Sequence, residues 1–168
     1  MTSDLLVCQL GRVDYRDALE VQAGLRARVL VTVGRHADPA ELGPLPANVH
    51  VERWVAQASV MPHAAAMVAH GGAGTTLAAL AAGVPLVLLP LSADQPINAR
   101  RVAELGAGLA LDGGRADVPK LAEALARVLE EPGYRAAADR VAAEVAALPP
   151  VEQVAADLAS FAQLQRAA

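Results

Sequence analysis

The chain has 168 residues, enough for one domain with a buried core, and 54% of them are hydrophobic, which excludes a disordered chain. Its net charge of −4 gives no electrostatic basis for binding nucleic acid. No apolar run reaches the roughly 20 residues of a membrane span, residues 1–4 lack the basic group of a signal peptide, and the single cysteine excludes an internal disulfide, so we expect a cytoplasmic protein.

The pattern of apolar, glycine and proline residues predicts alternating strands and helices. In chain order we expect a strand over 4–10, a helix over 17–26, a strand over 28–33, a loop over 34–48, a strand over 49–52, a helical turn over 57–63, a strand over 66–69, a helix over 74–82, a strand over 86–89, a helix over 96–105 and an edge strand over 108–111. Several strands are apolar throughout, as parallel strands covered on both sides are. The sequence therefore predicts an α/β fold, a Rossmann-like parallel sheet with helices on both faces.

Three further helices are expected in the remainder of the chain. Asp117 is a suitable N-cap for a helix over 118–130, and a second helix follows the Pro-Gly pair at 132–133 and runs to about 147. The Pro-Pro pair at 149–150 separates it from a last helix over 151–166. No linker interrupts residues 1–168, which we therefore treat as one domain.

A histidine and a glycine-rich turn follow the strand predicted over 66–69. Residues 68–76 read Val-Ala-His-Gly-Gly-Ala-Gly-Thr-Thr, and a helix begins within them. Glycines let a backbone approach a ligand closely, and the amides and dipole of a helix start favour negative charge, so this turn predicts a phosphate site. The residues expected to form it are His70, Gly72, Ala73, Gly74 and Thr75. The alternatives are a buried core histidine and a Thr75 that only caps the helix.

Two familiar phosphate-binding motifs do not fit this turn. The G-x-G-x-x-G motif needs a third glycine where the chain has Leu77, and it follows the first strand of a fold rather than a strand deep in the chain. A Walker loop ends in G-K-[ST], but the only lysine is Lys120.

Polar residues also follow other predicted strands. Asp94 and Gln95 come after the strand over 86–89, and Arg12 comes after the first strand. Because ligands of open parallel sheets lie beyond the carboxyl ends of the strands, these residues and the glycine-rich turn predict one site. Alternatively, Asp94 and Gln95 only cap the next helix, in whose first turn Asn98 is expected to be structural.

Trp54 is the only tryptophan and follows the strand over 49–52, together with Val55 and Gln57. An aromatic ring in this place predicts a platform for a nucleobase, since stacking of a base contributes about 1–3 kcal/mol. The alternative is an anchor in the hydrophobic core. The remaining histidines have no partner motif and are expected at the surface or in packing: His36, His50 and His63.

These pieces occur in a fixed order: W-x-x-Q at 54–57, H-G-G-A-G-T-T at 70–76, G-V-P at 83–85 and A-D-Q-P-x-N-A at 93–99. Together they resemble the donor-binding half of the GT-B glycosyltransferases that use sugar nucleotides, including the antibiotic and natural-product enzymes. The resemblance covers about 45–111 in detail. It implies inverting, metal-independent sugar transfer in which His70 assists the leaving diphosphate, Trp54 stacks on the base, and Asp94 and Gln95 hold the sugar.

The chain departs from the family at three positions. Many enzymes that use uridine diphosphate carry a glutamate against the ribose hydroxyls where this chain has Ala78. Thymidine nucleotides lack the 2′-hydroxyl, so we expect dTDP sugars to be favoured over UDP sugars. Arg12 replaces a small hydroxyl residue, although an arginine can also bind phosphate. Ala56 replaces the proline of W-x-P-Q.

The family's N-terminal domain binds the acceptor and usually supplies the catalytic histidine base. It is absent from this sequence, so we expect a truncated enzyme or one subunit of a split enzyme, inactive alone. The last helix is expected to carry an apolar stripe left bare by that domain. We expect no metal site and no cofactor, since the nucleotide sugar is a substrate. Two alternatives remain: a non-catalytic nucleotide-sugar-binding or scaffolding homologue, and a sugar-nucleotide epimerase-like domain.

Overall fold

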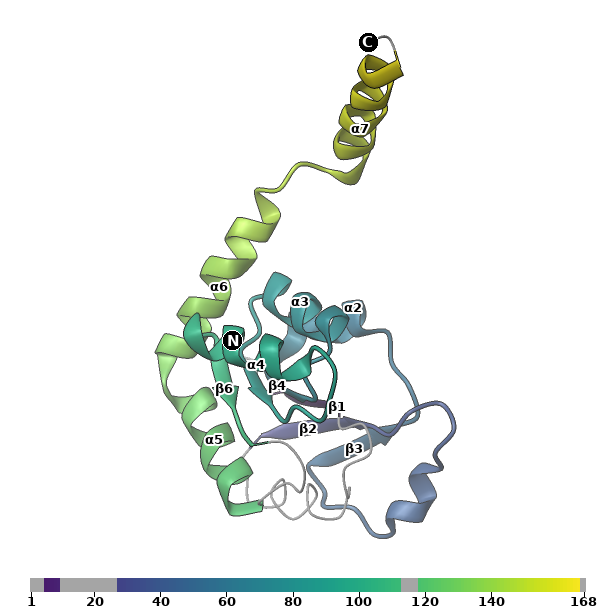
Figure 1. The fold of residues 1–168 in the computed structure, drawn as a ribbon. Helices are drawn as coiled ribbons and strands as arrows, with labels where there is room; N and C mark the ends of the chain where they lie inside the picture. Colours follow the sequence, from purple (N-terminus) through teal and green to yellow (C-terminus); the bar gives the residue numbers. More distant parts are fainter. Residues whose placement is uncertain (1–4, 10–26, 113–117, 167–168) are drawn as a thin grey trace.

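The computed structural model describes residues 5–9, 27–112 and 118–166, so the helix expected over 17–26, Asp117 and Arg12 lie outside the described residues. Its centre is a six-stranded sheet in the order β3-β2-β1-β4-β5-β6, with every neighbouring pair parallel (Figure 1). The strands are β1 (Leu5–Gln9), β2 (Arg28–Thr32), β3 (Val49–Glu52), β4 (Ala64–Ala69), β5 (Leu86–Leu88) and β6 (Gly108–Ala110). The predicted parallel sheet is confirmed.

The helices lie within a few residues of their predicted positions. They are α2 (Gln57–Val60), α3 (Ala73–Ala81), α4 (Gln95–Glu104), α5 (Val118–Glu130), α6 (Pro132–Ala146) and α7 (Val151–Arg166). Two short 3-10 helices, η1 (Pro39–Leu42) and η2 (Met61–His63), complete the described elements.

Two local predictions need correction. The stretch over 34–48 is not all loop, because η1 forms within it, where Asp38 Oδ1 accepts a hydrogen bond from the N–H of Ala40 at 3.1 Å. The strand predicted from residue 66 begins at Ala64, which pairs with Leu5 across an irregular step in the register. The run of alanines hides this start, because alanine has a low strand propensity.

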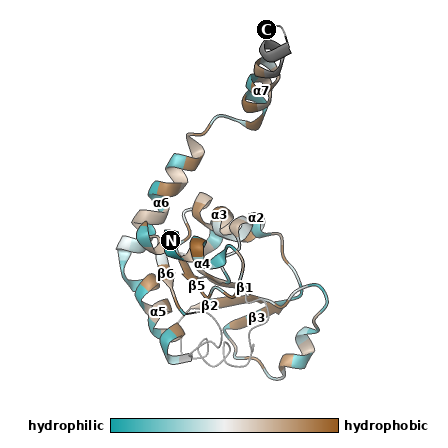
Figure 2. Cartoon of the chain, in the orientation of Figure 1, coloured by the Kyte–Doolittle hydropathy of each residue, from teal (hydrophilic) through white to brown (hydrophobic). Residues whose placement is uncertain are grey.

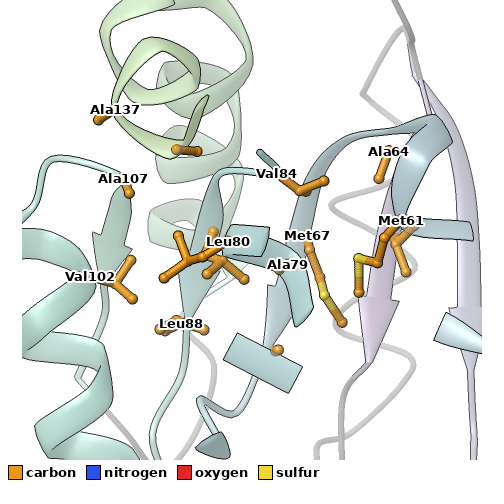
Figure 3. Close-up of a cluster of buried hydrophobic side chains, with 14 of the residues drawn as sticks. Met61, Ala64, Met67, Ala79, Leu80, Val84, Leu88, Val102, Ala107 and Ala137 are labelled. Atoms are coloured by element: carbon orange, nitrogen blue, oxygen red, sulfur yellow. The ribbon is translucent and has the colours of Figure 1, made fainter. Parts of the chain in front are cut away.

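Alternate residues of the strands pack against helices on opposite faces of the sheet. Val68 of β4 belongs to a cluster with Leu125 of α5, whereas its neighbour Met67 packs in a second cluster with α3, α4 and α6. Figure 3 shows side chains of this second cluster from those three helices: Leu80, Val102 and Ala137. Figure 2 shows apolar residues concentrated along the strands. Both faces are covered, which confirms the predicted architecture.

The last helix lies apart from the sheet. In Figure 1 the chain leaves α6 and runs outward into α7, and residues 151–161 are all exposed. Apolar side chains three and four residues apart form one stripe along it, each 40–73% exposed: Val151, Val154, Leu158 and Phe161. The predicted bare stripe is therefore present. Among the described residues, no helix has the length and apolar character needed to cross a bilayer.

Candidate functional site

The sheet changes its direction of growth at β1. The chain first adds β2 and β3 on one side of β1, and later adds β4, β5 and β6 on the other. The strands that follow β1 and β4, which are β2 and β5, therefore lie on opposite sides of this pair, and open α/β sheets bind ligands in the crevice at such a point. His70 is the residue directly after β4, so it lies at this crevice.

The two glycines after His70 fit closely around it. Gly71 has a φ of +88°, and a Cβ there would lie 3.3 Å from the backbone oxygen of Gln95. A Cβ on Gly72 would lie 2.7 Å from His70 Nε2, nearer than real side chains come. Glycine at position 72 therefore lets the imidazole rest directly against the start of α3.

The two ring nitrogens of His70 lie in different surroundings. Nδ1 is buried and has no hydrogen-bond partner within the described ranges, whereas Nε2 lies beside Gly72. Nε2 is therefore the ring nitrogen that lies at the start of α3.

The first turn of α3 begins at a glycine and has no side-chain cap. Gly72 is the N-cap and has no side chain to bond the following amides, which are those of Ala73, Gly74 and Thr75. The alternative in which Thr75 caps the helix is wrong, because Thr75 lies inside the first turn. Its hydroxyl accepts a hydrogen bond from Gln57 Nε2 at 3.2 Å, which joins the W-x-x-Q segment to the turn.

The loop before α4 is held by Gln95. Its Oε1 accepts hydrogen bonds from the N–H groups of Leu91 (2.8 Å) and Ser92 (3.1 Å), so this oxygen organises the loop, while Nε2 is the part left to donate to a ligand. Ala93, within the same loop, has a φ of +56°, which alanine rarely adopts. Asp94 occupies the N-cap position of α4 but makes no side-chain capping bond, contrary to the capping alternative.

Asn98 connects this loop to the glycine turn. Its Nδ2 donates to the backbone oxygen of Gly71 at 2.8 Å and to Asp94 Oδ2 at 2.9 Å. The residue is structural, as predicted, but it also fixes Asp94 relative to His70. Its spacing of four residues from Asp94 on a helix was the available signal.

Trp54 lies at the end of β3 with an arginine on its ring. The guanidinium carbon of Arg35 is 4.3 Å from the ring centroid, and Trp54 is 55% exposed, which contradicts a core anchor. A cleft of about 680 Å³ adjoins the ring, within the usual range for small-molecule sites. It is lined by Arg35, Asp38, Pro39, Ala40, Glu52, Arg53 and Trp54.

Hydrogen bonds thus join Gln57, the His70 turn and Asp94, and the backbone of Gln95 lies close to Gly71 in the same turn. Trp54 and the half-buried Val55 stand just before Gln57 in the chain. Arg35 was not predicted, although its place after Gly34 at the end of β2 is a signal of the same kind as that of His70.

The other histidines do not join this arrangement. His36, His50 and His63 are exposed, as predicted, and His50 Nε2 lies 2.8 Å from Glu52 Oε1 on the edge strand. Within the described part of the chain, no three His, Cys, Asp or Glu side chains are grouped so as to hold a metal ion. The metal requirement of any reaction stays a prediction.

Comparison with known proteins gives a family match over residues 16–161, to the family described as "Erythromycin biosynthesis protein CIII-like, C-terminal domain". The elloramycin glycosyltransferase ElmGT of Streptomyces olivaceus is 48% identical over 139 residues, which are 83% of this chain and 35% of that protein. The 4'-demethylrebeccamycin synthase of Lentzea aerocolonigenes is 40% identical over 73% of this chain and 29% of its own length. The chain spans about a third of the length of these curated relatives.

Solved structures of glycosyltransferases share the fold. The glycosyltransferase VinC in complex with DTDP superposes with a TM-score of 0.86 at 31% identity, covering 95% of this chain and 41% of that one. SnogD of Streptomyces nogalater gives a TM-score of 0.80 at 34% identity, over 94% of this chain and 42% of that one.

A first prediction concerns the fit of His70 against Gly72. Gly72→Ala would push the imidazole aside and lower the free energy of unfolding by about 1–3 kcal/mol, as overpacking does. Gly74→Ala is the control, because a Cβ added at position 74 would have no atom within 4 Å. Alanine is also about 1 kcal/mol more favourable than glycine in a helix. Urea unfolding and the NMR shifts of the His70 ring measure both effects. Equal behaviour of the two variants would contradict the contact.

Proposed function

The chain belongs to the family of erythromycin CIII-like C-terminal domains, and from that premise we propose that it is the donor-binding half of an inverting glycosyltransferase of natural-product biosynthesis. It would take a sugar from a nucleoside diphosphate sugar, without a metal ion or cofactor, for transfer to a small-molecule acceptor. A cytoplasmic location belongs to the same proposal.

The observation that carries the proposal is His70 against the start of α3. Nε2 lies beside Gly72, which gives the helix no side-chain cap, and the first turn of α3 follows at once with Ala73, Gly74 and Thr75. A diphosphate bound there would receive hydrogen bonds from the ring and the amides, and the helix dipole would favour its charge. Because charge grows on the diphosphate as it leaves the sugar, the same donors would stabilise the transition state.

The sugar would be held by the loop before α4. Asp94 accepts one hydrogen bond from Asn98, and a carboxylate has further lone pairs for sugar hydroxyls. Gln95 would donate through Nε2, since its oxygen is engaged by the loop amides. Held in this way, the anomeric carbon would be oriented for attack by an acceptor on the face opposite the diphosphate.

The acceptor and its base would come from the remainder of a full-length enzyme. A general base must lie about 2.6–3.2 Å from the proton that it removes. Of the histidines, only His70 stands at the crevice, and it is assigned to the diphosphate. The stripe of α7 is a fitting contact for that second half, because it is apolar and exposed here.

We further propose a preference for thymidine over uridine diphosphate. Ala78 lies one turn after Thr75 in α3, and a methyl group cannot accept a hydrogen bond from a ribose 2′-hydroxyl. The relative VinC, which is 31% identical, has been solved with DTDP, in agreement with this choice.

His70→Ala should weaken thymidine diphosphate by about 1.5–3 kcal/mol, or roughly 10- to 150-fold, because a hydrogen bond to a charged group is lost. His50→Ala, which removes an exposed histidine on β3, is the matched control and should bind as the wild type does. Titration calorimetry measures the affinities. Unchanged affinity in folded His70→Ala would remove this site assignment.

Ala78→Glu tests the choice of nucleotide. The new carboxylate should raise affinity for uridine diphosphate several-fold, since it could accept a hydrogen bond from the 2′-hydroxyl. Affinity for 2′-deoxyuridine diphosphate should not rise, and this ligand separates the hydroxyl from the ring methyl. A wild-type chain that prefers uridine diphosphate to thymidine diphosphate would refute the proposed donor while leaving the fold untouched.

The chain alone should transfer no sugar. An activated thymidine diphosphate sugar incubated with a panel of phenolic acceptors should give no glycoside above background, because we assign the base and the acceptor site to the other half of the enzyme. Addition of an acceptor-binding half from a relative should restore product. Robust turnover by the chain alone would overturn the half-enzyme proposal and direct attention to His36, His50 and His63.

A further inference from the structure

The contact between Arg35 and the indole of Trp54 has no part in the site proposed above. The guanidinium of Arg35 stacks on this ring at 4.3 Å. We propose that Arg35 is a positioning residue for the nucleobase: it covers one face of Trp54 and holds the ring so that a pyrimidine stacks on the opposite face. This inference rests on the proposed function, because it presumes a nucleotide ligand.

Neighbouring strand ends place the two residues together. β2 and β3 pair in parallel, and the N–H of Val33 donates to the oxygen of Glu52 at 3.1 Å, so both strands end side by side. Gly34 then adopts a φ of +92°, and the N–H of Ala37 donates to its oxygen at 3.3 Å. This turn brings residue 35 over Trp54, which lies two residues after the end of β3.

A second link ties the Arg35 loop to Trp54. Asp38 caps η1 and also pairs with Arg53, the residue before Trp54, with 3.6 Å between Oδ1 and Nη2. Both side chains are more than half exposed, so the pair adds little stability. Its effect is geometric, since it joins the loop after β2 to the segment that carries the indole.

The distance between the Arg35 guanidinium and the Trp54 ring excludes a base from the face that Arg35 covers. A separation of 4.3 Å is contact between stacked groups and leaves no space for a base between the guanidinium and the ring. Trp54 is nevertheless 55% exposed, so much of its remaining surface is accessible. An exposed indole would otherwise sample several rotamers, and ordering it on binding costs affinity. By holding the indole in place before the nucleotide binds, Arg35 reduces this cost.

The test uses the fact that Trp54 is the only tryptophan, so that fluorescence reports on this ring alone. Arg35→Ala is compared with Arg35→Lys, which keeps a cation, and with Arg140→Ala, which removes an exposed arginine from α6. Thermal unfolding checks that each variant is folded. Acrylamide quenching measures access to the ring, and calorimetry measures binding of thymidine diphosphate and of inorganic pyrophosphate.

We expect Arg35→Ala to increase quenching and to weaken thymidine diphosphate about two- to fivefold, the usual worth of a cation–π contact at an exposed site. Pyrophosphate binding should not change, because pyrophosphate uses only the His70 turn. Arg35→Lys should fall between wild type and Arg35→Ala, and Arg140→Ala should match the wild type.

Three results would overturn the inference. An equal loss of pyrophosphate binding would make Arg35 a phosphate ligand, and tighter thymidine diphosphate binding would show that Arg35 blocks the base. Unchanged quenching and affinity would leave the residue without a role. The proposed function fails separately, if the wild-type chain binds neither pyrophosphate nor thymidine diphosphate.

Discussion

The placement of β4 beside β1, rather than beside β3, is the constraint on which the site depends. Because the chain crosses back at this point, β2 and β5, the strands that follow β1 and β4, lie on opposite sides of this pair, and open α/β sheets bind ligands at the carboxyl ends of such strands. The buried residues of β4 hold this arrangement, since both of its faces pack against helices and both of its edges are paired. Because β4 is buried and paired on both edges, a site at its end is held rigidly.

The shape of the crevice at the end of β4 depends on close contacts around His70. The His70 ring can rest on α3 only because position 72 has no Cβ, and position 71 turns only because it is glycine. Asn98 links this glycine turn to the loop that contains Asp94, because its Nδ2 donates to the backbone oxygen of Gly71 and to the Asp94 carboxylate. In the proposed function a diphosphate and a sugar are adjoining parts of one substrate, so a single amide side chain that joins the two proposed binding segments would keep them in register.

Much of the fold and of the site could be predicted from the sequence, because their signals are local. Apolar strands, the prolines that begin helices and the glycine turn after a strand each follow from a few neighbouring residues. The start of β4 could not, since Ala64 becomes a strand residue only by pairing with Leu5. Arg35 was missed for the same reason. Its place after a strand marks this edge of the sheet, but its contact with Trp54, 19 positions later, is not visible in the sequence.

The separation of α7 from the sheet has a consequence for how such enzymes could be recombined. The helix lies beyond two consecutive prolines, and its apolar side chains within 151–161 are exposed rather than packed in the core of this half. A chimaera that receives this half would receive α7 with it. Its success would then depend on whether the new host offers a matching surface to Val151, Val154, Leu158 and Phe161, even where the nucleotide site is fully compatible.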